Sequence, residues 1–202
     1  HHGWRYMAFG PDDKLYVAIG APCNVCDRDK EGYATLVRMN ADGSGREVVA
    51  RGVRNSVGFT WHPRTRELWF TDNGRDMLGD DVPPCELNRL SKPGEHFGFP
   101  FCHGADVRDP EFGSLGRCDA ISRPVQSLGA HVAPLGLLFD RRGDVIIAVD
   151  GTAVEIRGDL TWLGMPLTWL WWSITALAVI AGAAVKQIPA NASKQAVAAR
   201  VT

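Results

Sequence analysis

Short apolar segments, each followed by a polar corner and a second apolar segment, recur three times along the chain. The copies read MAFGPDDKLYVAIG at 7–20, GFTWHPRTRELWFTDNG at 58–74 and GLLFDRRGDVIIAVDG at 136–151. Each copy ends in a glycine, and Pro, Asp, Arg or Gly occupies its corner. Apolar runs of this length between turn residues predict β-hairpins, so the sequence predicts a hairpin repeated about every 50 to 80 residues.

Further strands are expected between and within the copies, and no stretch before residue 160 has a helical period. The expected strands are Leu15–Ile19, Ala34–Met39, Glu47–Ala50, Leu68–Thr71 and Val145–Val149. Small antiparallel sheets repeated at this spacing are typical of a β-propeller, whose blades must stack because one blade cannot bury its own faces. We therefore predict an all-β fold, a partial β-propeller of about three blades, over residues 1–152.

The third copy has a second interpretation. Its segment GDVIIAVDGTAV, at 143–154, also resembles the core of a PDZ domain. The flanking residues are too few for a whole PDZ domain, and the match to the other two hairpins is direct. We therefore favour a third propeller blade.

The C-terminal part has a different pattern. Residues 161–185 carry no charged side chain and include four tryptophans. A segment of this length can span a bilayer, and Trp is typical of the membrane interface. We predict a linker at 153–160, a transmembrane helix at 161–185 and a short basic tail at 186–202, with the tail in the cytoplasm. The alternatives are a buried hydrophobic helix and a tail that is out of frame.

Charge and cysteine content narrow the classes of partner and compartment. The 22 basic and 23 acidic residues give a net charge of −1, and no basic run forms a phosphate-binding stripe, so nucleic acid is not expected as a partner. Cys23 and Cys26 form a lone CxxC, for which a local disulfide or free thiols is favoured over a metal or redox site. Cys102 and Cys118 flank a loop rich in Gly and Asp and could form a second disulfide. Disulfides would favour an oxidising compartment.

Chemically competent side chains precede the repeated hairpins at matching positions. Alignment of the copies on their corners makes Gly10, His62 and Asp140 equivalent. The residues eight positions earlier, together with their immediate neighbours, are His2, Arg54, Asn55, His131 and Val132. Because the inner strands of propeller blades begin near one end of the central channel, we expect these residues to converge at its mouth.

An imidazole at this mouth can accept a proton from a hydroxyl group near neutral pH. A guanidinium and an amide can hold a planar, anionic ligand through forked hydrogen bonds. These side chains are therefore candidates for catalysis and ligand binding. The alternative is that they are ordinary polar residues that fill the channel.

Several motifs, in order, resemble a known family. They are HHGWRYMAFGPDDKLYVAIGAPCNVC, RGVRNSVGFTWHP, LWFTDNGRDMLGDDVPPCELN and HFGFPFCHG. They are similar to soluble PQQ-dependent glucose and L-sorbosone dehydrogenases, and the resemblance extends from residue 1 to about 136 and more loosely to 151. It implies a six-bladed propeller that binds pyrroloquinoline quinone (PQQ) and calcium and oxidises an aldose or aldehyde sugar.

The resemblance also implies roles for individual residues. His2 falls at the position of the catalytic base, and Arg54 and Asn55 fall on an Arg-Asn motif that contacts the cofactor. His131, which the spacing alone places beside them, is a further candidate cofactor ligand. The stretch Asn73–Arg75, which contains Gly74, falls where backbone carbonyls bind calcium. Because calcium prefers oxygen ligands, three acidic residues that follow are also candidates. They are Asp80, Asp81 and Glu86.

Two departures from the family pattern affect this interpretation. Glucose dehydrogenases have an Asp after the glycine that ends the first hairpin, whereas Ala21 follows Gly20 here, which favours the sorbosone type and leaves the orienting partner of His2 open. The basic residues of the later blades are also missing. We expect a periplasmic enzyme, anchored to the inner membrane through residues 161–185, that passes electrons to a cytochrome or a quinone. The alternative is a non-catalytic, membrane-tethered propeller module.

Overall fold

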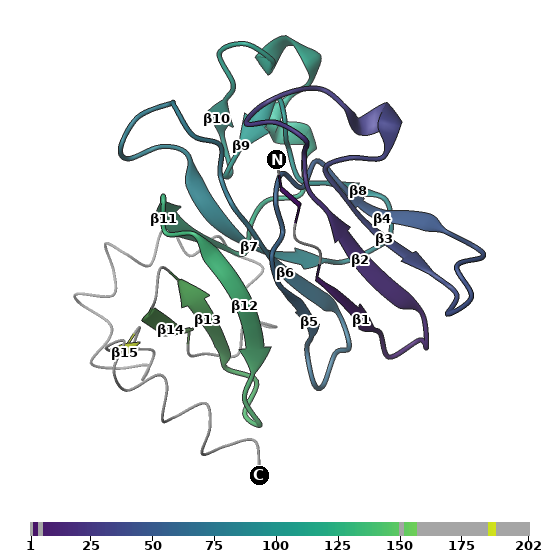
Figure 1. Ribbon diagram of the computed structural model, residues 1–202. Helices are drawn as coiled ribbons and strands as arrows, with labels where there is room; N and C mark the ends of the chain where they lie inside the picture. Colours follow the sequence, from purple (N-terminus) through teal and green to yellow (C-terminus); the bar gives the residue numbers. More distant parts are fainter. Residues whose placement is uncertain (1, 4–5, 150–151, 157–185, 189–202) are drawn as a thin grey trace.

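The computed structural model describes residues 2–3, 6–149, 152–156 and 186–188, and this part of the chain is built from strands (Figure 1). Its helical segments are three short 3₁₀ turns, Asp29–Glu31, Gly113–Leu115 and Cys118–Ala120. The strands form three successive antiparallel sheets that do not close into a ring. Each sheet therefore corresponds to one predicted blade.

The three sheets have the same up-and-down plan, with one inner strand at the edge. The first contains β1 (Met7–Phe9), β2 (Leu15–Ile19), β3 (Thr35–Met39) and β4 (Glu47–Arg51), with β8 (Glu95–His96) added parallel to β4. The second contains β5 (Phe59–Trp61), β6 (Leu68–Asp72), β7 (Pro84–Leu90) and β11 (Gln126–Ala130). The third contains β12 (Pro134–Phe139), β13 (Val145–Val149), β14 (Thr152–Ile156) and β15 (Lys186–Ile188). A small ribbon, β9 (Cys102–His103) and β10 (Val107–Arg108), lies between β8 and β11 in sequence.

Backbone hydrogen bonds at the hairpin corners confirm the alignment of the three repeats. The first corner residue donates its N–H group to a carbonyl four or five positions later in every copy. These bonds are Gly10 to Lys14 (2.8 Å), His62 to Glu67 (2.9 Å) and Asp140 to Asp144 (2.9 Å). The three inner strands β1, β5 and β12 therefore end at corresponding corners, as the spacing predicted.

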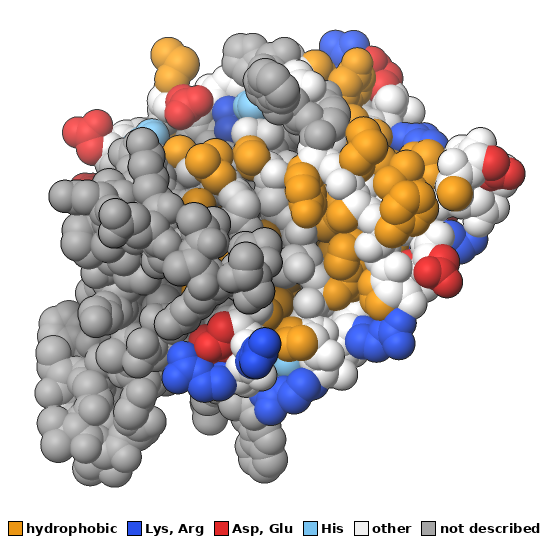
Figure 2. Space-filling model, turned by 60° about the horizontal axis from the view of Figure 1, so that its bottom comes forward, with side chains coloured by type: hydrophobic (Ala, Val, Ile, Leu, Met, Phe, Trp, Pro, Cys, Tyr) orange, Lys and Arg blue, Asp and Glu red, His pale blue; other side chains and the backbone are white. Residues whose placement is uncertain are grey.

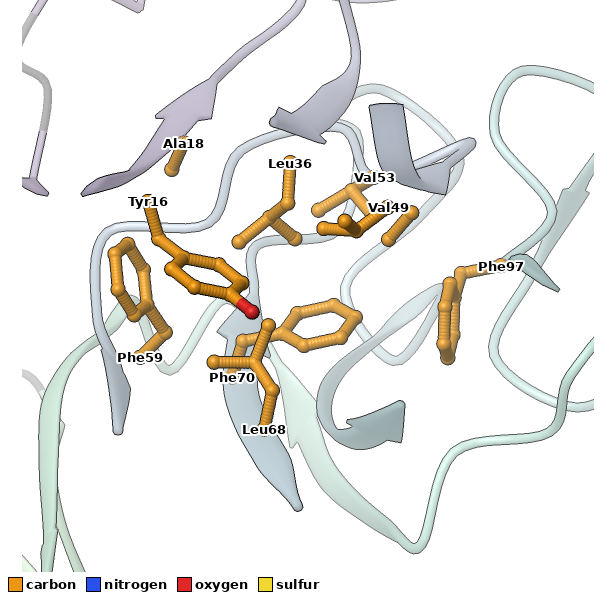
Figure 3. Close-up of a cluster of buried hydrophobic side chains, with 10 residues drawn as sticks. Tyr16, Ala18, Leu36, Val49, Val53, Phe59, Leu68, Phe70 and Phe97 are labelled. Atoms are coloured by element: carbon orange, nitrogen blue, oxygen red, sulfur yellow. The ribbon is translucent and has the colours of Figure 1, made fainter. Parts of the chain in front are cut away.

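The central sheet is covered on both faces, and β6 shows this most clearly. Leu68 and Phe70 point into the cluster shared with the first sheet, which Figure 3 shows beside Tyr16 and Leu36. Trp69, between them in sequence, points the other way into a cluster with the third sheet, where its ring lies 5.5 Å from that of Phe139. Since side chains alternate along a strand, a strand buried on both faces must be apolar throughout. This explains the continuous run Leu-Trp-Phe in β6.

Apolar side chains remain exposed on the first sheet. Met7 and Phe9 on β1 are 56% and 59% exposed, whereas Ala8 between them packs on the core. Figure 2 shows hydrophobic side chains gathered on one side of the described surface. The face of β1 that carries Met7 and Phe9 thus has no covering sheet in the described part of the chain.

The strand and repeat predictions are confirmed to within about two residues, whereas the predicted end of the β part was too early. We expected a linker from residue 153, but β14 continues the third sheet to Ile156 through a complete ladder with β13. Lys186–Ile188, expected in the basic tail, pairs with β14 as β15. The hairpin of the third repeat, β12–β13, lies at one edge of its sheet, as the hairpins of the other two repeats do. This agrees with the interpretation of the third repeat as a blade. The predicted helix at 161–185 lies outside the described residues, and no described helix is long and apolar enough to cross a membrane.

The two-sided core predicts a difference between two phenylalanines. Phe70 is fully buried, with its ring 4.9 Å from that of Phe97, so Phe70→Ala should lower the free energy of unfolding by about 3–5 kcal/mol. Phe9→Ala, the control at an exposed position, should cost less than about 0.5 kcal/mol. Urea unfolding followed by Trp fluorescence measures both. Equal costs would mean that the cluster between the first two sheets does not form in solution.

Candidate functional site

His2 is held by the backbone at the end of the first hairpin. Its Nδ1 atom lies 2.6 Å from the carbonyl oxygen of Ala21, just after β2. A carbonyl oxygen can only accept a hydrogen bond, so Nδ1 carries the proton. In the neutral ring Nε2 then has the lone pair, which is the form that a general base requires.

Gly20 lies where His2, Arg54 and Asn55 meet. A Cβ atom on Gly20 would lie 2.8 Å from Cβ of His2 and 3.3 Å from both the Arg54 carbonyl oxygen and Oδ1 of Asn55. The three residues therefore surround the same backbone position, as the alignment of the repeats predicted. Only glycine allows this close approach without displacing a neighbour.

A buried carboxylate at the end of β6 anchors this group. Asp72 accepts the backbone N–H groups of Arg54 (2.9 Å) and Asn55 (2.6 Å). The Arg54 carbonyl in turn accepts the N–H group of Ala21 (2.7 Å), whose own carbonyl holds His2. Burial raises the pKa of Asp72 to about 7, although both N–H donors act in the opposite direction. A continuous line of hydrogen bonds thus connects Asp72 to His2.

Asp72 was missed as a site residue in the sequence, although a signal was present. It follows four strand residues that form part of an apolar pattern, and a carboxylate at the end of a buried strand needs hydrogen-bond donors. Its donors lie 17 and 18 residues earlier, in a segment with no strand of its own. Spacing alone does not reveal such a pairing.

The guanidinium of Arg54 is buried and fully hydrogen-bonded within the protein. Nε donates to the Asn24 carbonyl (2.8 Å), and Nη1 donates to the carbonyls of Asn73 (3.2 Å) and Gly74 (2.8 Å). Nη2 donates to Oδ1 of Asn24 (2.9 Å) and lies 3.5 Å from the carboxylate of Asp76. Burial lowers the pKa of Arg54, and the charges of Asp72 and Asp76 oppose this. All five N–H groups of this side chain already have acceptors within the protein. Its contact with a cofactor therefore stays a prediction.

His131 contacts the loop between β6 and β7, which Arg54 also contacts. Its Nε2 is 2.9 Å from the Gly79 carbonyl oxygen, and its Nδ1 is 3.8 Å from Asp76. Asp76 therefore lies between Arg54 and His131. No contact of His131 with His2 or Asn55 is present among the described residues, so its role as a cofactor ligand also stays a prediction.

The described residues do not assemble the predicted calcium ligands. Asp80 and Asp81 are exposed, and Glu86 is buried and accepts hydrogen bonds from Gly104 N–H (2.6 Å) and from Asn88 (2.9 Å). The carbonyl of Gly74 faces the Arg54 cation. No group of three His, Cys, Asp or Glu side chains in the described ranges is arranged to hold a metal ion. These side chains do not fit a calcium site in this arrangement, and no chemical step is derived through calcium.

The side chain of Arg75 belongs to a buried ionic cluster. Its guanidinium donates to Asp109 (2.6 Å), and His103 Nε2 is 2.8 Å from the same carboxylate oxygen. Burial opposes ionisation of Asp109, but its hydrogen bonds, that of His103 first among them, hold its pKa at about 2. Burial also lowers the pKa of His103. The cluster attaches the loop after β6 to the β9–β10 ribbon.

Both cysteine pairs are disulfides. Cys23 is bonded to Cys26 in the turn after β2, and Cys102 to Cys118 across the loop that carries β10. Cys85 is buried and has a free thiol. A cavity of about 10 Å³ lies beneath the mouth, bounded by Arg54, Asp72, Glu86 and His103 among others. It is about the size of one water molecule and is too small for a sugar or a quinone.

Comparison with known proteins decides the family. The family model described as Glucose / Sorbosone dehydrogenase matches residues 1–154. The chain belongs to this family. The resemblance seen in the sequence motifs is thereby confirmed, and the glucose/sorbosone dehydrogenase match includes all three repeats.

Individual relatives of this glucose/sorbosone dehydrogenase chain are longer than it is. An uncharacterized protein of Borreliella burgdorferi is 41% identical over 142 residues, which are 69% of this chain and 37% of that protein. An oxidoreductase of the glucose dehydrogenase type from Thermus thermophilus is 26% identical with a TM-score of 0.58, over 76% of this chain and 48% of that one. The PQQ domain of pyranose dehydrogenase from Coprinopsis cinerea shares the fold, at 17% identity and a TM-score of 0.65, over 79% and 53%. The chain thus spans about half the length of these solved structures and less of its curated relative.

Gly20→Ala tests the arrangement around His2. The added methyl group would lie 2.8 Å from the Cβ of His2, which is too close, so the imidazole should move off the Ala21 carbonyl. Long-range ¹H–¹⁵N NMR of the ring should show the Nδ1–H form in the wild type and a mixture of forms in the variant. Gly136→Ala is the control, since a Cβ there meets no atom within 4 Å. An unchanged His2 signal in Gly20→Ala would contradict the geometry.

Glu86 predicts that stability depends on pH. Burial first, and the nearby charge of Asp72 second, raise the pKa of Glu86 from 4.5 to about 8. The folded state then keeps a proton that the unfolded state releases above pH 4.5, so stability should fall as the pH rises from about 4.5 to 8. For one proton the slope is at most about 1.4 kcal/mol per pH unit.

Glu86→Gln keeps the side chain neutral and should reduce this slope, as measured by urea unfolding at pH 5 and pH 8. Glu111→Gln, at an exposed position, is the control and should leave the slope unchanged. A slope that Glu86→Gln leaves unchanged would show that Glu86 is ionised in the folded state.

Proposed function

We propose that the chain carries the reacting end of a PQQ-dependent sugar dehydrogenase, with His2 as the base that removes the hydroxyl proton of an aldose or aldehyde sugar. The hydrogen bond between His2 and the Ala21 carbonyl carries this proposal, because it fixes the tautomer in which Nε2 can accept a proton. Membership of the glucose/sorbosone dehydrogenase family supports the reaction class.

The polar groups beside His2 fit a ligand with carbonyl oxygens, as PQQ has. The side-chain amide of Asn55 has no hydrogen-bond partner in the described part of the chain, and it lies next to His2 across Gly20. An amide that is held by its backbone and unpaired at its tip can donate to a quinone or sugar oxygen. Asn55 would therefore hold the reacting end of the cofactor, whereas the Arg54 side chain shapes the loops around it.

The roles of the protein groups follow from this arrangement. The Ala21 carbonyl orients His2, and Asp72 keeps the Arg54–Asn55 backbone and Ala21 in register. His2 takes the proton from the hydroxyl at the carbon to be oxidised, and Ala21 stabilises the resulting imidazolium through its carbonyl. PQQ, when bound, supplies the acceptor for the hydride from that carbon.

The compartment and the redox partner belong to the same proposal. Two disulfides among the described residues support an oxidising compartment, which for this chain would be the periplasm. Electrons would leave to a cytochrome or a quinone, and residues 161–185 would anchor the chain to the inner membrane. Carbonate extraction of membranes from expressing cells tests the anchor.

One observation favours a second function, a non-catalytic propeller module tethered to a membrane. The guanidinium of Arg54 has no N–H group left for a cofactor. Because protein groups already accept every hydrogen bond of the Arg54 cation, the channel mouth could bind a neutral ligand without redox chemistry. Failure of the chain to bind PQQ would favour this function.

Activity with PQQ separates the two functions. The purified chain is titrated with PQQ by fluorescence, and reduction of a dye acceptor is followed with a panel of aldoses. The proposal expects stoichiometric PQQ binding and a sugar-dependent rate that His2→Ala lowers by about 10²–10⁴-fold, the usual contribution of a general base. Lys92→Ala, on an exposed turn, should leave the rate unchanged. Full activity in His2→Ala would refute the role of this base.

A further inference from the structure

The disulfide turn after β2 contacts the channel mouth through a single residue. Asn24 lies between Cys23 and Cys26, and its partners are 30 and 52 residues away in sequence. Its backbone carbonyl accepts from Nε of Arg54 (2.8 Å), and its Oδ1 accepts from Nη2 of the same guanidinium (2.9 Å). One residue thus holds one edge of the buried cation.

The same side chain also holds the loop that follows β6. Oδ1 of Asn24 accepts the backbone N–H of Asp76 (2.8 Å), and Nδ2 donates to the carbonyl of Asp76 (3.1 Å). Asn24 therefore bonds to both sides of the peptide backbone at Asp76 and to the guanidinium of Arg54. Asparagine suits this position because its amide is both donor and acceptor and has no charge.

Arg54 transmits this arrangement to the next loop. The other side of its guanidinium, Nη1, bonds the carbonyls of Asn73 and Gly74. Arg54 is 5% exposed, so water can replace a lost acceptor only poorly. The orientation of these two carbonyls depends on the guanidinium, and the orientation of the guanidinium depends on Asn24.

We propose that Asn24, presented by the Cys23–Cys26 disulfide, is a positioning residue that fixes the Arg54 guanidinium and, through it, the loop 73–76 at the channel mouth. The disulfide closes a ring of four residues, which restricts the orientations open to Asn24. Asn24 occupies the Nε–Nη2 edge of Arg54, the edge that a carboxylate would bind in a forked pair. It therefore directs the guanidinium toward the protein's own carbonyls. The link to catalysis rests on the proposed function, whereas the link to Arg54 does not.

Hydrogen exchange at the Arg54 side chain tests the proposal without any cofactor. The Nη2–H signal of Arg54, assigned by its loss in Arg54→Lys, should exchange slowly in the full chain, because Nη2 donates to the side chain of Asn24. Asn24→Ala and the double variant Cys23→Ser/Cys26→Ser should each accelerate its exchange at least tenfold. Asn24→Asp, which keeps the Oδ1 acceptor, should keep most of the protection. Backbone amides of β6 should stay protected in all variants.

Asn40→Ala is the matched control. Asn40 also lies on a turn and bonds through both ends of its amide, to Lys14 and to Ser44, but these contacts are away from the mouth. Its loss should not change the Arg54 signal. Equal exchange rates in Asn24→Ala and Asn40→Ala would overturn the proposal. If Asn24→Ala fails to fold, the double serine variant is compared with Asn24→Asp. Faster Arg54 exchange in the double variant alone would support the proposal, and equal rates would overturn it.

A PQQ titration of the same variants addresses the function. The proposal expects Asn24→Ala to weaken PQQ binding at least tenfold, with kcat at saturating PQQ within twofold of wild type because His2 is untouched. A wild-type chain that does not bind PQQ refutes the proposed function, while the exchange rates still decide the role of Asn24. Unchanged PQQ affinity in Asn24→Ala, together with accelerated Arg54 exchange, would overturn the link between Asn24 and the cofactor.

Discussion

The carboxylate of Asp72 must find donors because it is buried at the end of β6, and the backbone N–H groups of Arg54 and Asn55 are those donors. An unpaired buried charge would cost several kcal/mol, about as much as the whole stability of many domains. The pairing brings the segment before β5 against the end of β6. The same segment accepts the N–H of Ala21, and Ala21 holds His2. The mouth is therefore organised from the core outward.

The sheets behind this mouth explain why it forms where it does. Each inner strand ends at a corner that is closed by a corresponding hydrogen bond, so the beginnings of these strands lie at the opposite end of their sheets. Sheets that pack face to face through β6 then bring these beginnings together. Thr71 and Asn73 reinforce the contact by donating to the carbonyls of Leu135 (2.9 Å) and Pro134 (2.9 Å) on β12. The residues at the end of β6 thus both join the second and third sheets and position the backbone of the candidate site.

The sequence predicted the strands, the repeat and the residues that meet around Gly20, because these depend on periodicity and turn chemistry. It missed what depends on pairing across the fold. Asp72 and Asn24 were not among the candidates, because their hydrogen-bond partners lie 17 to 52 residues away in sequence. Arg54 was interpreted as a ligand for a cofactor, and in the structure its donors point to three carbonyls on two loops. The acids 80, 81 and 86 were grouped by proximity in sequence, but the chain separates them, with Glu86 buried and the other two exposed.

Ala21 stands where glucose dehydrogenases have an Asp, and this would have a chemical consequence for the base proposed at His2. A carbonyl orients an imidazole as well as a carboxylate does, because both accept the Nδ1–H bond. A carboxylate also stabilises the imidazolium by its full charge, whereas a carbonyl offers only a dipole. The base proposed at His2 would therefore give up its proton more readily after accepting it, and it would depend more on the groups that fix the carbonyl. Asp72 and the backbone of Arg54 fix this carbonyl. The carboxyl group of Asp72 is therefore connected to the imidazole of His2 through the backbone of Arg54 and Ala21 and does not contact it directly.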